Sequence, residues 1–386
     1  MYREIYLDNS ATTRPYDEVI EYMNDINRNT YGNPSSLHTK GIEAERLLKT
    51  ARERIARCFD IDGKEIYFTS GGTESNNLAI RGYLEANPRK GRSIITTKIE
   101  HPSVTEVFRY LENTGYKVDY IDVDHEGKIN LEQLKDRICE DTALISIILV
   151  NNETGAVQPI EEIAAIKNNR NSQSVLHVDA VQAFGKMSVL PKKTAIDLLS
   201  VSSHKIHGPK GVGVLYASKT IRLKPVLLGG GQESSLRSGT ENVPGIAGFG
   251  LAAEMTFRHI DDSGKKVANL KSSFIEELKY CSFEYKVLSS PESSPFILNI
   301  GFVGLRSEVL LHHLEERNIY VSTGSACSAR KNTKSHVLAA MGLPSSIIDG
   351  AVRFSFSVFN SPEDIVDTVN ALKDIVPRIQ IRRNNR

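Results

Sequence analysis

Residues 143–150 read Ala-Leu-Ile-Ser-Ile-Ile-Leu-Val, an almost continuous apolar run. A strand that is buried on both faces has this composition, because neither face meets water. Shorter strand-like runs lie around it in the chain, at residues 66–69, 94–97, 118–123, 175–178 and 198–201. Helical patterns separate most of these runs, as after Gly41, where apolar residues recur at spacings of three to five. The alternation predicts an α/β fold with a large, doubly wound, mostly parallel sheet.

A second, smaller α/β unit is predicted further along the chain. Gly229-Gly230-Gly231 is followed by Pro244, which can open a long helix. Beyond it, residues 297–300 and 319–321 have strand composition and residues 309–314 have helical composition. We place the large domain at residues 13–256 and the small domain at residues 1–12 and 257–386.

The composition excludes several classes of protein. The 386 residues carry 48 Lys and Arg against 47 Asp and Glu, so no global field attracts nucleic acid or a membrane surface. No apolar run reaches the ~18 residues of a membrane span. Four cysteines make no disulfide framework, and neither they nor the histidines have metal-ligand spacing. We expect a soluble, cytoplasmic protein without a metal.

The arginines at 378, 382, 383 and 386 predict a solvated, frayed end. A contact with nucleic acid or a partner is the alternative for this tail.

A phosphate site is predicted where the 66–69 strand ends. Residues 69–77 read Thr-Ser-Gly-Gly-Thr-Glu-Ser-Asn-Asn, so two glycines turn the chain and a helix begins. The free N–H groups and the dipole of a helix start bind anions, and the hydroxyls of Ser70 and Thr73 add donors. A glycine turn with a Ser/Thr cap explains the same residues without a ligand.

Two further residues follow predicted strands. Asp179 ends the 175–178 strand, where the carboxyl ends of a doubly wound sheet face the ligand crevice. It is either a helix cap or a functional acid. Lys205 lies in Ser-Ser-His-Lys-Ile-His-Gly-Pro-Lys-Gly, residues 202–211. It is either a solvated charge or an amine that forms a Schiff base.

One cysteine has the surroundings of a reactive thiol. Cys327 lies among small and hydroxylated residues, with Arg330 and Lys331 near enough to favour its thiolate. Cys58 and Cys139 are interpreted as core or helix residues, and Cys281 follows a helix without suggestive neighbours.

Three more residues stand near predicted strand ends or within a strand. His101 precedes Pro102, Asn152 follows the most apolar strand, and Arg353 lies inside the strand-like Val-Arg-Phe-Ser-Phe. A helix cap, a turn residue and a buried ion pair are the simple structural explanations. Their combination with a phosphate cradle, a carboxylate and a lysine, however, matches what pyridoxal phosphate requires of a protein.

The chain resembles the cysteine desulfurases of the NifS/IscS type, within the class V aminotransferase family. The resemblance runs from Tyr6-Leu7-Asp8-Asn9-Ser10-Ala11-Thr12-Thr13 through Tyr31-Gly32-Asn33-Pro34-Ser35-Ser36 and Arg237-Ser238-Gly239-Thr240 to Arg353. The loop Ser322-Thr323-Gly324-Ser325-Ala326-Cys327 is similar to that of the group I enzymes. The resemblance implies a fold-type I pyridoxal-phosphate enzyme and a homodimer.

The resemblance also implies a role for individual residues. Lys205 would bind the cofactor aldehyde, Asp179 the ring nitrogen and Gln182 the ring hydroxyl. His101 would stack on the ring and transfer protons. The phosphate would be held by Gly72, Thr73, Ser202 and His204, with Thr240 supplied by the other subunit. Asn152 would contact both cofactor and substrate, beside Asn33 and Arg353, and Cys327 would be the nucleophile.

The implied reaction converts L-cysteine to L-alanine and leaves a persulfide on Cys327. The sulfur would pass to an acceptor protein, either an iron–sulfur scaffold or a tRNA-thiolation enzyme. A selenocysteine lyase and a class V transaminase are the alternative enzymes; a sulfur-relay adaptor without catalysis is the alternative from another class.

Overall fold

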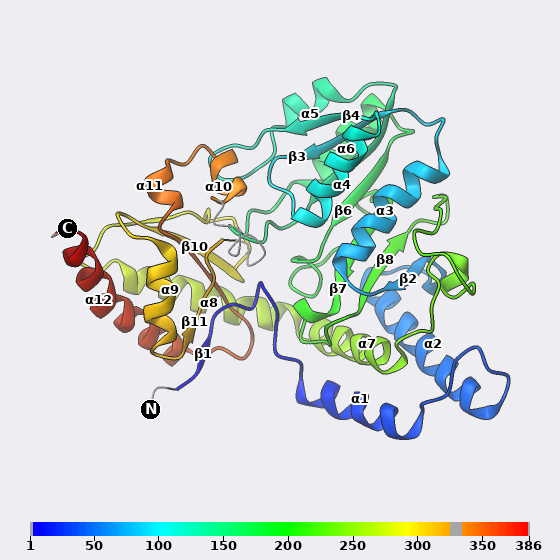
Figure 1. The fold of residues 1–386 in the computed structure, drawn as a ribbon, viewed down its shortest axis with the longest axis horizontal. Coiled ribbons are helices and arrows are strands. Elements are labelled where there is room, and N and C mark those ends of the chain that lie inside the picture. Colours follow the sequence, from blue (N-terminus) through cyan, green and yellow to red (C-terminus); the bar gives the residue numbers. More distant parts are fainter. Residues whose placement is uncertain (1–2, 325–333, 385–386) are drawn as a thin grey trace.

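The largest sheet of the computed structural model, which describes residues 3–324 and 334–384, has seven strands and lies mostly in the right half of the view in Figure 1. In sheet order its strands are β2 (Ile66–Thr69), β8 (Gly213–Ala217), β7 (Leu198–Ser202), β6 (Val175–Asp179), β5 (Thr142–Ile148), β3 (Ser93–Thr97) and β4 (Lys117–Ile121). The five strands from β7 to β4 are mutually parallel, and β8 runs antiparallel to both of its neighbours. The predicted doubly wound, mostly parallel sheet is confirmed.

Both faces of this sheet are covered, which explains the apolar run at residues 143–150. Successive side chains of a strand point to opposite faces. Leu144 and Leu198 accordingly pack in the cluster that contains α3 (Gly72–Ala86) and α4 (Pro102–Asn113). Ile145 and Leu199 pack in the other cluster, with α2 (Thr39–Phe59), α6 (Ile160–Arg170) and α7 (Val243–Arg258). Every residue of β5 is buried as a result.

The remaining helices of this part lie outside those two layers. Helix α1 (Asp17–Asn29) packs on α7, and α5 (Leu131–Arg137) on α6. Three short 3-10 turns are η1 (Gly63–Glu65), η2 (Ser203–Lys205) and η3 (Glu233–Ser235).

The C-terminal part contains two smaller sheets. Strands β12 (Ala351–Ser355), β10 (Ile297–Phe302) and β9 (Tyr285–Val287) form an antiparallel sheet in that order. Strand β1 (Ile5–Tyr6), at the other end of the chain, pairs in parallel with β11 (Ile319–Tyr320). The N-terminal residues therefore lie against the C-terminal part, as Figure 1 shows.

Helices cover these small sheets. They are α8 (Ile260–Leu278), α9 (Ser307–Glu315), α10 (His336–Ala340), α11 (Ser345–Ile348) and α12 (Pro362–Asn384). Helix α12 packs on both α8 and α9.

Two expectations are wrong in whole or in part. The described backbone from Arg378 to Asn384 is helical and not frayed, although the Arg378 side chain is 72% exposed, as expected of a solvated tail, and pairs with Asp374 one turn earlier. Cys139 is neither a core residue nor a helix residue: it is exposed and lies after α5 ends at Arg137.

Candidate active site

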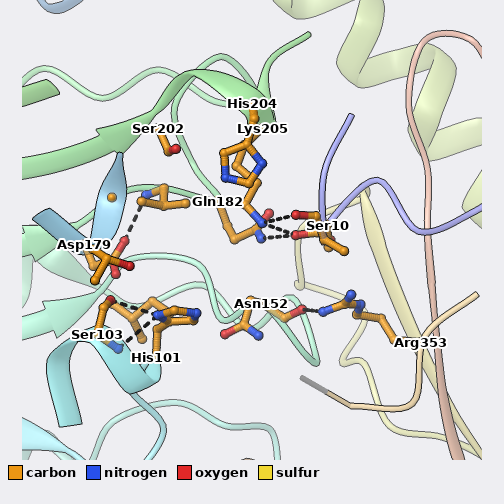
Figure 2. A pocket seen from close by; sticks show the side chains of 15 residues that line it. Ser10, His101, Ser103, Asn152, Asp179, Gln182, Ser202, His204, Lys205 and Arg353 are labelled. Carbon is orange, nitrogen blue, oxygen red and sulfur yellow. Dashed lines mark hydrogen bonds between the residues drawn. The ribbon is translucent and has the colours of Figure 1, made fainter. Parts of the chain in front are cut away.

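The carboxyl ends of the parallel strands and the C-terminal part enclose a cavity of about 260 Å³ (Figure 2). Ten residues singled out from the sequence line it: Gly72, Thr73, His101, Asn152, Asp179, Gln182, Ser202, His204, Lys205 and Arg353. Five others complete the lining: Ser10, Ala11, Ser103, Ile148 and Val181. The topology therefore gathers residues that are up to 343 positions apart, from Ser10 to Arg353.

The predicted anion site lies at the start of α3. The first N–H groups of a helix have no partners within it, no side chain of Gly71 caps this start, and Gly72 and Thr73, the first residues of α3, line the cavity. A Cβ at position 72 would lie 2.7 Å from Cγ2 of Val181, so glycine permits this close approach of strand end and helix. The Ser202 hydroxyl oxygen, on the same wall, is buried and has no hydrogen-bond partner among the described residues. An unpaired buried donor beside a helix start is the arrangement that an anion satisfies.

Asp179 ends β6 with its carboxylate fixed from two sides. Oδ1 accepts a hydrogen bond from the Val181 backbone N–H at 3.0 Å. Oδ2 accepts one from Nδ2 of Asn76 in α3 at 2.8 Å. The residue is 3% exposed and lines the cavity (Figure 2). The helix-cap interpretation is wrong, because a turn and not a helix follows Asp179; its carboxylate caps that turn and lines the cavity, and its role as a functional acid stays a prediction.

Lys205 reaches the cavity from the end of η2. Its Nζ donates hydrogen bonds to the backbone carbonyls of Ser10 and Ala11, to the latter at 2.8 Å (Figure 2). The N-terminal segment therefore passes directly beside the amine. Sequence reasoning did not assign Ser10 and Ala11 to the site, because backbone carbonyls leave no signature in residue type.

His101 caps α4 and presents a neutral imidazole. Nδ1 accepts from the Ser103 backbone N–H at 3.2 Å and lies 2.8 Å from the Ser103 hydroxyl. Burial lowers the pKa of His101; Asp179 opposes this shift, and the charges of Lys205 and His336 add to it. With Nδ1 accepting, the proton of the neutral ring lies on Nε2.

His204 is likewise neutral. Burial, followed by the charge of Lys205, lowers its pKa to about 3. It therefore enters the cavity wall as a hydrogen-bonding group and not as a cation.

Two partners of opposite polarity fix the Gln182 amide. Nε2 donates to the Ser10 carbonyl at 2.9 Å, and Oε1 accepts from Nζ of Lys186 at 2.9 Å. The Ser10 carbonyl can only accept, so the flipped amide would turn its own oxygen toward that carbonyl and lose this bond. Burial, with the charges of Lys205 and Arg353, lowers the pKa of Lys186 to about 7.

Arg353 lies in the middle of β12 with its side chain 1% exposed. Nη2 pairs with Oδ1 of Asp8 at 2.7 Å, and Nη1 donates to the Asn152 carbonyl at 2.8 Å (Figure 2). The buried ion pair expected as one explanation is therefore present. The guanidinium also lines the cavity, so it is available to an anionic ligand.

Cys327 lies outside the described residues. The described residues on either side of it are attached to the cavity wall. Ser322 exchanges two backbone hydrogen bonds with Arg353, at 2.8 and 3.2 Å. The Ser335 hydroxyl donates to Oε2 of Glu153 at 2.5 Å. Glu153 directly follows the cavity residue Asn152 in the chain.

Burial disfavours the thiolate at two of the other cysteines, Cys58 and Cys281. Burial raises the pKa of Cys58 to about 12 and raises that of Cys281. Cys139 is exposed and contacts the Thr142 hydroxyl.

Asn33 and Thr240 do not join the cavity of their own chain. Both are exposed, and the Asn33 side chain accepts a hydrogen bond from the Ser35 backbone N–H at 2.9 Å. Their predicted roles stay predictions.

Within residues 3–324 and 334–384, no group of three His, Cys, Asp or Glu side chains is arranged to hold a metal ion. None of the helices in this part of the chain has both the length and the apolar composition needed to cross a bilayer.

Known proteins share both the sequence and the fold. The family described as aminotransferase class-V matches residues 5–367. A cysteine desulfurase of Trichormus azollae is 42% identical over 380 residues, which cover 97% of this chain and 94% of the relative. A putative cysteine desulfurase of Bacillus subtilis is 42% identical over 377 residues and is covered to 99%.

Solved structures agree with this. A NifS-like protein superposes with a TM-score of 0.92 at 38% identity, covering 97% of this chain and all of that one. SspA, solved in complex with cysteine, superposes with a TM-score of 0.82 at 34% identity over 92% of this chain and all of that one. The chain belongs to the class V aminotransferase family. Within that family it is an enzyme of the cysteine desulfurase group.

Proposed function

We propose that the enzyme uses pyridoxal phosphate to convert L-cysteine to L-alanine and passes the sulfur through a persulfide on Cys327. The observation that carries the proposal is one cavity in which Lys205, Asp179, His101 and the unpaired Ser202 hydroxyl meet. A relative solved in complex with cysteine supports this choice of substrate.

The residues of the cavity fit the cofactor. Gly72, Thr73 and Ser202 would hold its phosphate, because they supply free donors at a helix start. Asp179 would accept a hydrogen bond from the ring nitrogen and keep it protonated, and Gln182 would donate to the ring hydroxyl. Pyridoxal phosphate supplies an aldehyde that binds amines and a ring that accepts the electron pair released at Cα.

The chain's own groups would handle the protons and the substrate. Lys205, whose amine faces the cavity, would accept the Cα proton. His101, neutral with its proton on Nε2, would donate to or accept from the substrate. Arg353 would bind the substrate carboxylate through N–H groups that Asp8 and Asn152 do not use.

Cys327 would then receive the sulfur. Its thiolate attacks the substrate sulfur, so an S–S bond forms while the Cβ–S bond breaks, and the electron pair of that bond stays with carbon. After protonation, L-cysteine and one enzyme thiol have become L-alanine and one enzyme persulfide. The atoms and electrons balance without an external oxidant. An acceptor protein, an iron–sulfur scaffold or a tRNA-thiolation enzyme, would take the sulfur through its own thiol.

A homodimer would complete the site. Tyr31, Leu37 and Leu228 are large apolar residues that are 73%, 96% and 84% exposed. They lie on the segments that carry Asn33 and Thr240. A second copy covering this surface would bring Thr240 of one chain to the phosphate of the other, and sedimentation would measure the association.

Turnover of L-cysteine tests the proposal. The cofactor-loaded protein should release alanine and sulfide in equal amounts when a thiol reductant is present. Cys327→Ser should bind the cofactor with unchanged absorbance and lose alanine production, whereas Cys139→Ser, the matched change at an exposed thiol, should keep it. Full activity of Cys327→Ser would contradict the assignment of the nucleophile.

A further inference from the structure

The guanidinium that would bind the substrate carboxylate already holds a carboxylate. Asp8 contacts Nη2 of Arg353 at 2.7 Å, and its side chain is 19% exposed. With the Asn152 carbonyl on Nη1, two of the five N–H donors of Arg353 are engaged. The remaining donors include Nε, which is buried and has no partner among the described residues. The Asp8 carboxylate thus offsets the charge of the Arg353 guanidinium. Other N–H groups of the guanidinium are not used by Asp8 or Asn152 and can donate to a ligand.

The backbone holds Asp8 rigidly in this place. Its main chain forms a bridge to Ser355, two residues beyond Arg353 on the same strand. Its carbonyl accepts hydrogen bonds from the N–H groups of Ala11 and Thr12, at 3.0 and 3.4 Å. The turn that carries Ser10 and Ala11 into the cavity wall therefore also fixes the Asp8 carboxylate against the guanidinium.

The neighbouring titratable groups have hydrogen-bond partners other than the Asp8 carboxylate. Burial, followed by the Asp8 charge, raises the pKa of Tyr6 to about 12, so Tyr6 is an uncharged neighbour. Lys205 donates to the Ser10 and Ala11 carbonyls, and Asp179 accepts from Asn76 and Val181. Among the described side chains, Asp8 forms its ion pair with Arg353.

We propose that Asp8 is a positioning residue that orients Arg353 and sets how tightly the cavity binds a carboxylate. The inference deepens the proposed function and rests on it. The carboxylate of Asp8 aims the guanidinium and offsets its charge. L-alanine carries the same carboxylate as L-cysteine. An Arg353 guanidinium whose charge was not offset by Asp8 would therefore bind both the substrate and the product more tightly. Such uniform binding lowers KM without raising kcat.

Two variants separate orientation from charge. Asp8→Asn keeps the oxygen that accepts from Nη2 and removes the negative charge. Asp8→Ala removes both. The matched control is Asp364→Asn, which changes a carboxylate paired with Arg3 at 2.8 Å, outside the cavity.

Two unreactive probes separate the carboxylate from the rest of the substrate. 3-Mercaptopropionate has the thiol and the carboxylate of cysteine but no amine. 3-Mercapto-1-propanol replaces its carboxylate by a neutral alcohol. Both are titrated calorimetrically into the cofactor-loaded enzyme, so that the result needs no turnover.

The expected result is specific for the anion. Asp8→Asn should bind 3-mercaptopropionate about tenfold more tightly than the wild type, because the guanidinium charge is no longer offset. Asp8→Ala should bind 3-mercaptopropionate more weakly than Asp8→Asn, by a factor of about five or more, because the guanidinium has lost the acceptor that orients it. Affinity for 3-mercapto-1-propanol, and all affinities of Asp364→Asn, should stay at the wild-type value. With L-cysteine, Asp8→Asn should lower KM and leave kcat no higher.

Contrary results are equally clear. Unchanged or weaker 3-mercaptopropionate binding by Asp8→Asn would overturn the charge-setting role. Equal binding by Asp8→Asn and Asp8→Ala would overturn the positioning role. If the wild type released no alanine while the binding pattern held, the proposed reaction would fail and the inference about Asp8 would stand.

Discussion

Replacing Asp179 by asparagine tests whether the negative charge of this carboxylate binds the cofactor. The Asp179 carboxylate accepts two hydrogen bonds, from Nδ2 of Asn76 and from the Val181 N–H. An asparagine has only one oxygen, so one of these buried donors must face an NH₂ group. An unsatisfied buried donor costs about 1–3 kcal/mol, which is the expected loss in the free energy of unfolding of the cofactor-free protein.

The loss of cofactor affinity should be larger than a structural defect explains. If Asp179 holds the protonated ring nitrogen as proposed, that charge-assisted hydrogen bond would contribute about 1.5–3 kcal/mol, and its loss would make the Kd about 10–150 times higher. Urea unfolding measures the first quantity, and absorbance titration with pyridoxal phosphate measures the second.

The control variant is Asp197→Asn. Asp197 accepts from the Leu176 N–H at 2.8 Å and pairs with Lys167 at 3.3 Å, but it does not line the cavity. Its replacement should lower stability and leave cofactor affinity unchanged. The reasoning is refuted if Asp179→Asn binds the cofactor within twofold of the wild type, or if Asp197→Asn weakens binding as much.

Three further substitutions have defined outcomes. Lys205→Met should prevent covalent trapping of the cofactor by borohydride, seen by mass spectrometry, and reduce alanine release about 100-fold or more; near-normal release would disprove its role as base. Ser202→Ala removes a buried hydroxyl that has no partner among the described residues, so urea unfolding of the cofactor-free protein should show no loss of stability. Cofactor affinity should fall about 2- to 10-fold. A destabilised variant with normal affinity would contradict this. Lys186 has a folded pKa of about 7, whereas a lysine in the unfolded chain titrates near pH 10, so over this window the unfolded state binds the extra proton and stability rises with pH. Lys186→Met should lose that rise, up to about 1.4 kcal/mol per pH unit, and parallel pH profiles for variant and wild type would count against it.

The sheet was predictable because its strands are buried on both faces. Residues such as Leu144 and Ile145 pack on opposite helix layers, and this demand leaves a continuous apolar run in the sequence. Asp179 and Lys205 could be predicted to meet because parallel strands end at one edge of the sheet.

Features that depend on distant partners were not predictable. The Ser10 and Ala11 carbonyls approach Lys205 through the backbone of the N-terminal segment, which any residue type could supply. The tail was expected to fray because of its arginines, yet the buried face of α12 that contains Leu372 and Val376 continues with Ile379, which packs against the core. The helix therefore has an apolar contact beyond Arg378, which the charge of the tail did not reveal.

One measurement tests the central claim most directly. The cofactor-loaded enzyme is mixed with one equivalent of L-cysteine without reductant, alanine is quantified, and the protein is alkylated, digested and examined by mass spectrometry. The account predicts one alanine per site and one additional sulfur atom on the peptide that contains Cys327. Alanine release without sulfur on Cys327, or sulfur on Cys58, Cys139 or Cys281 instead, would contradict it.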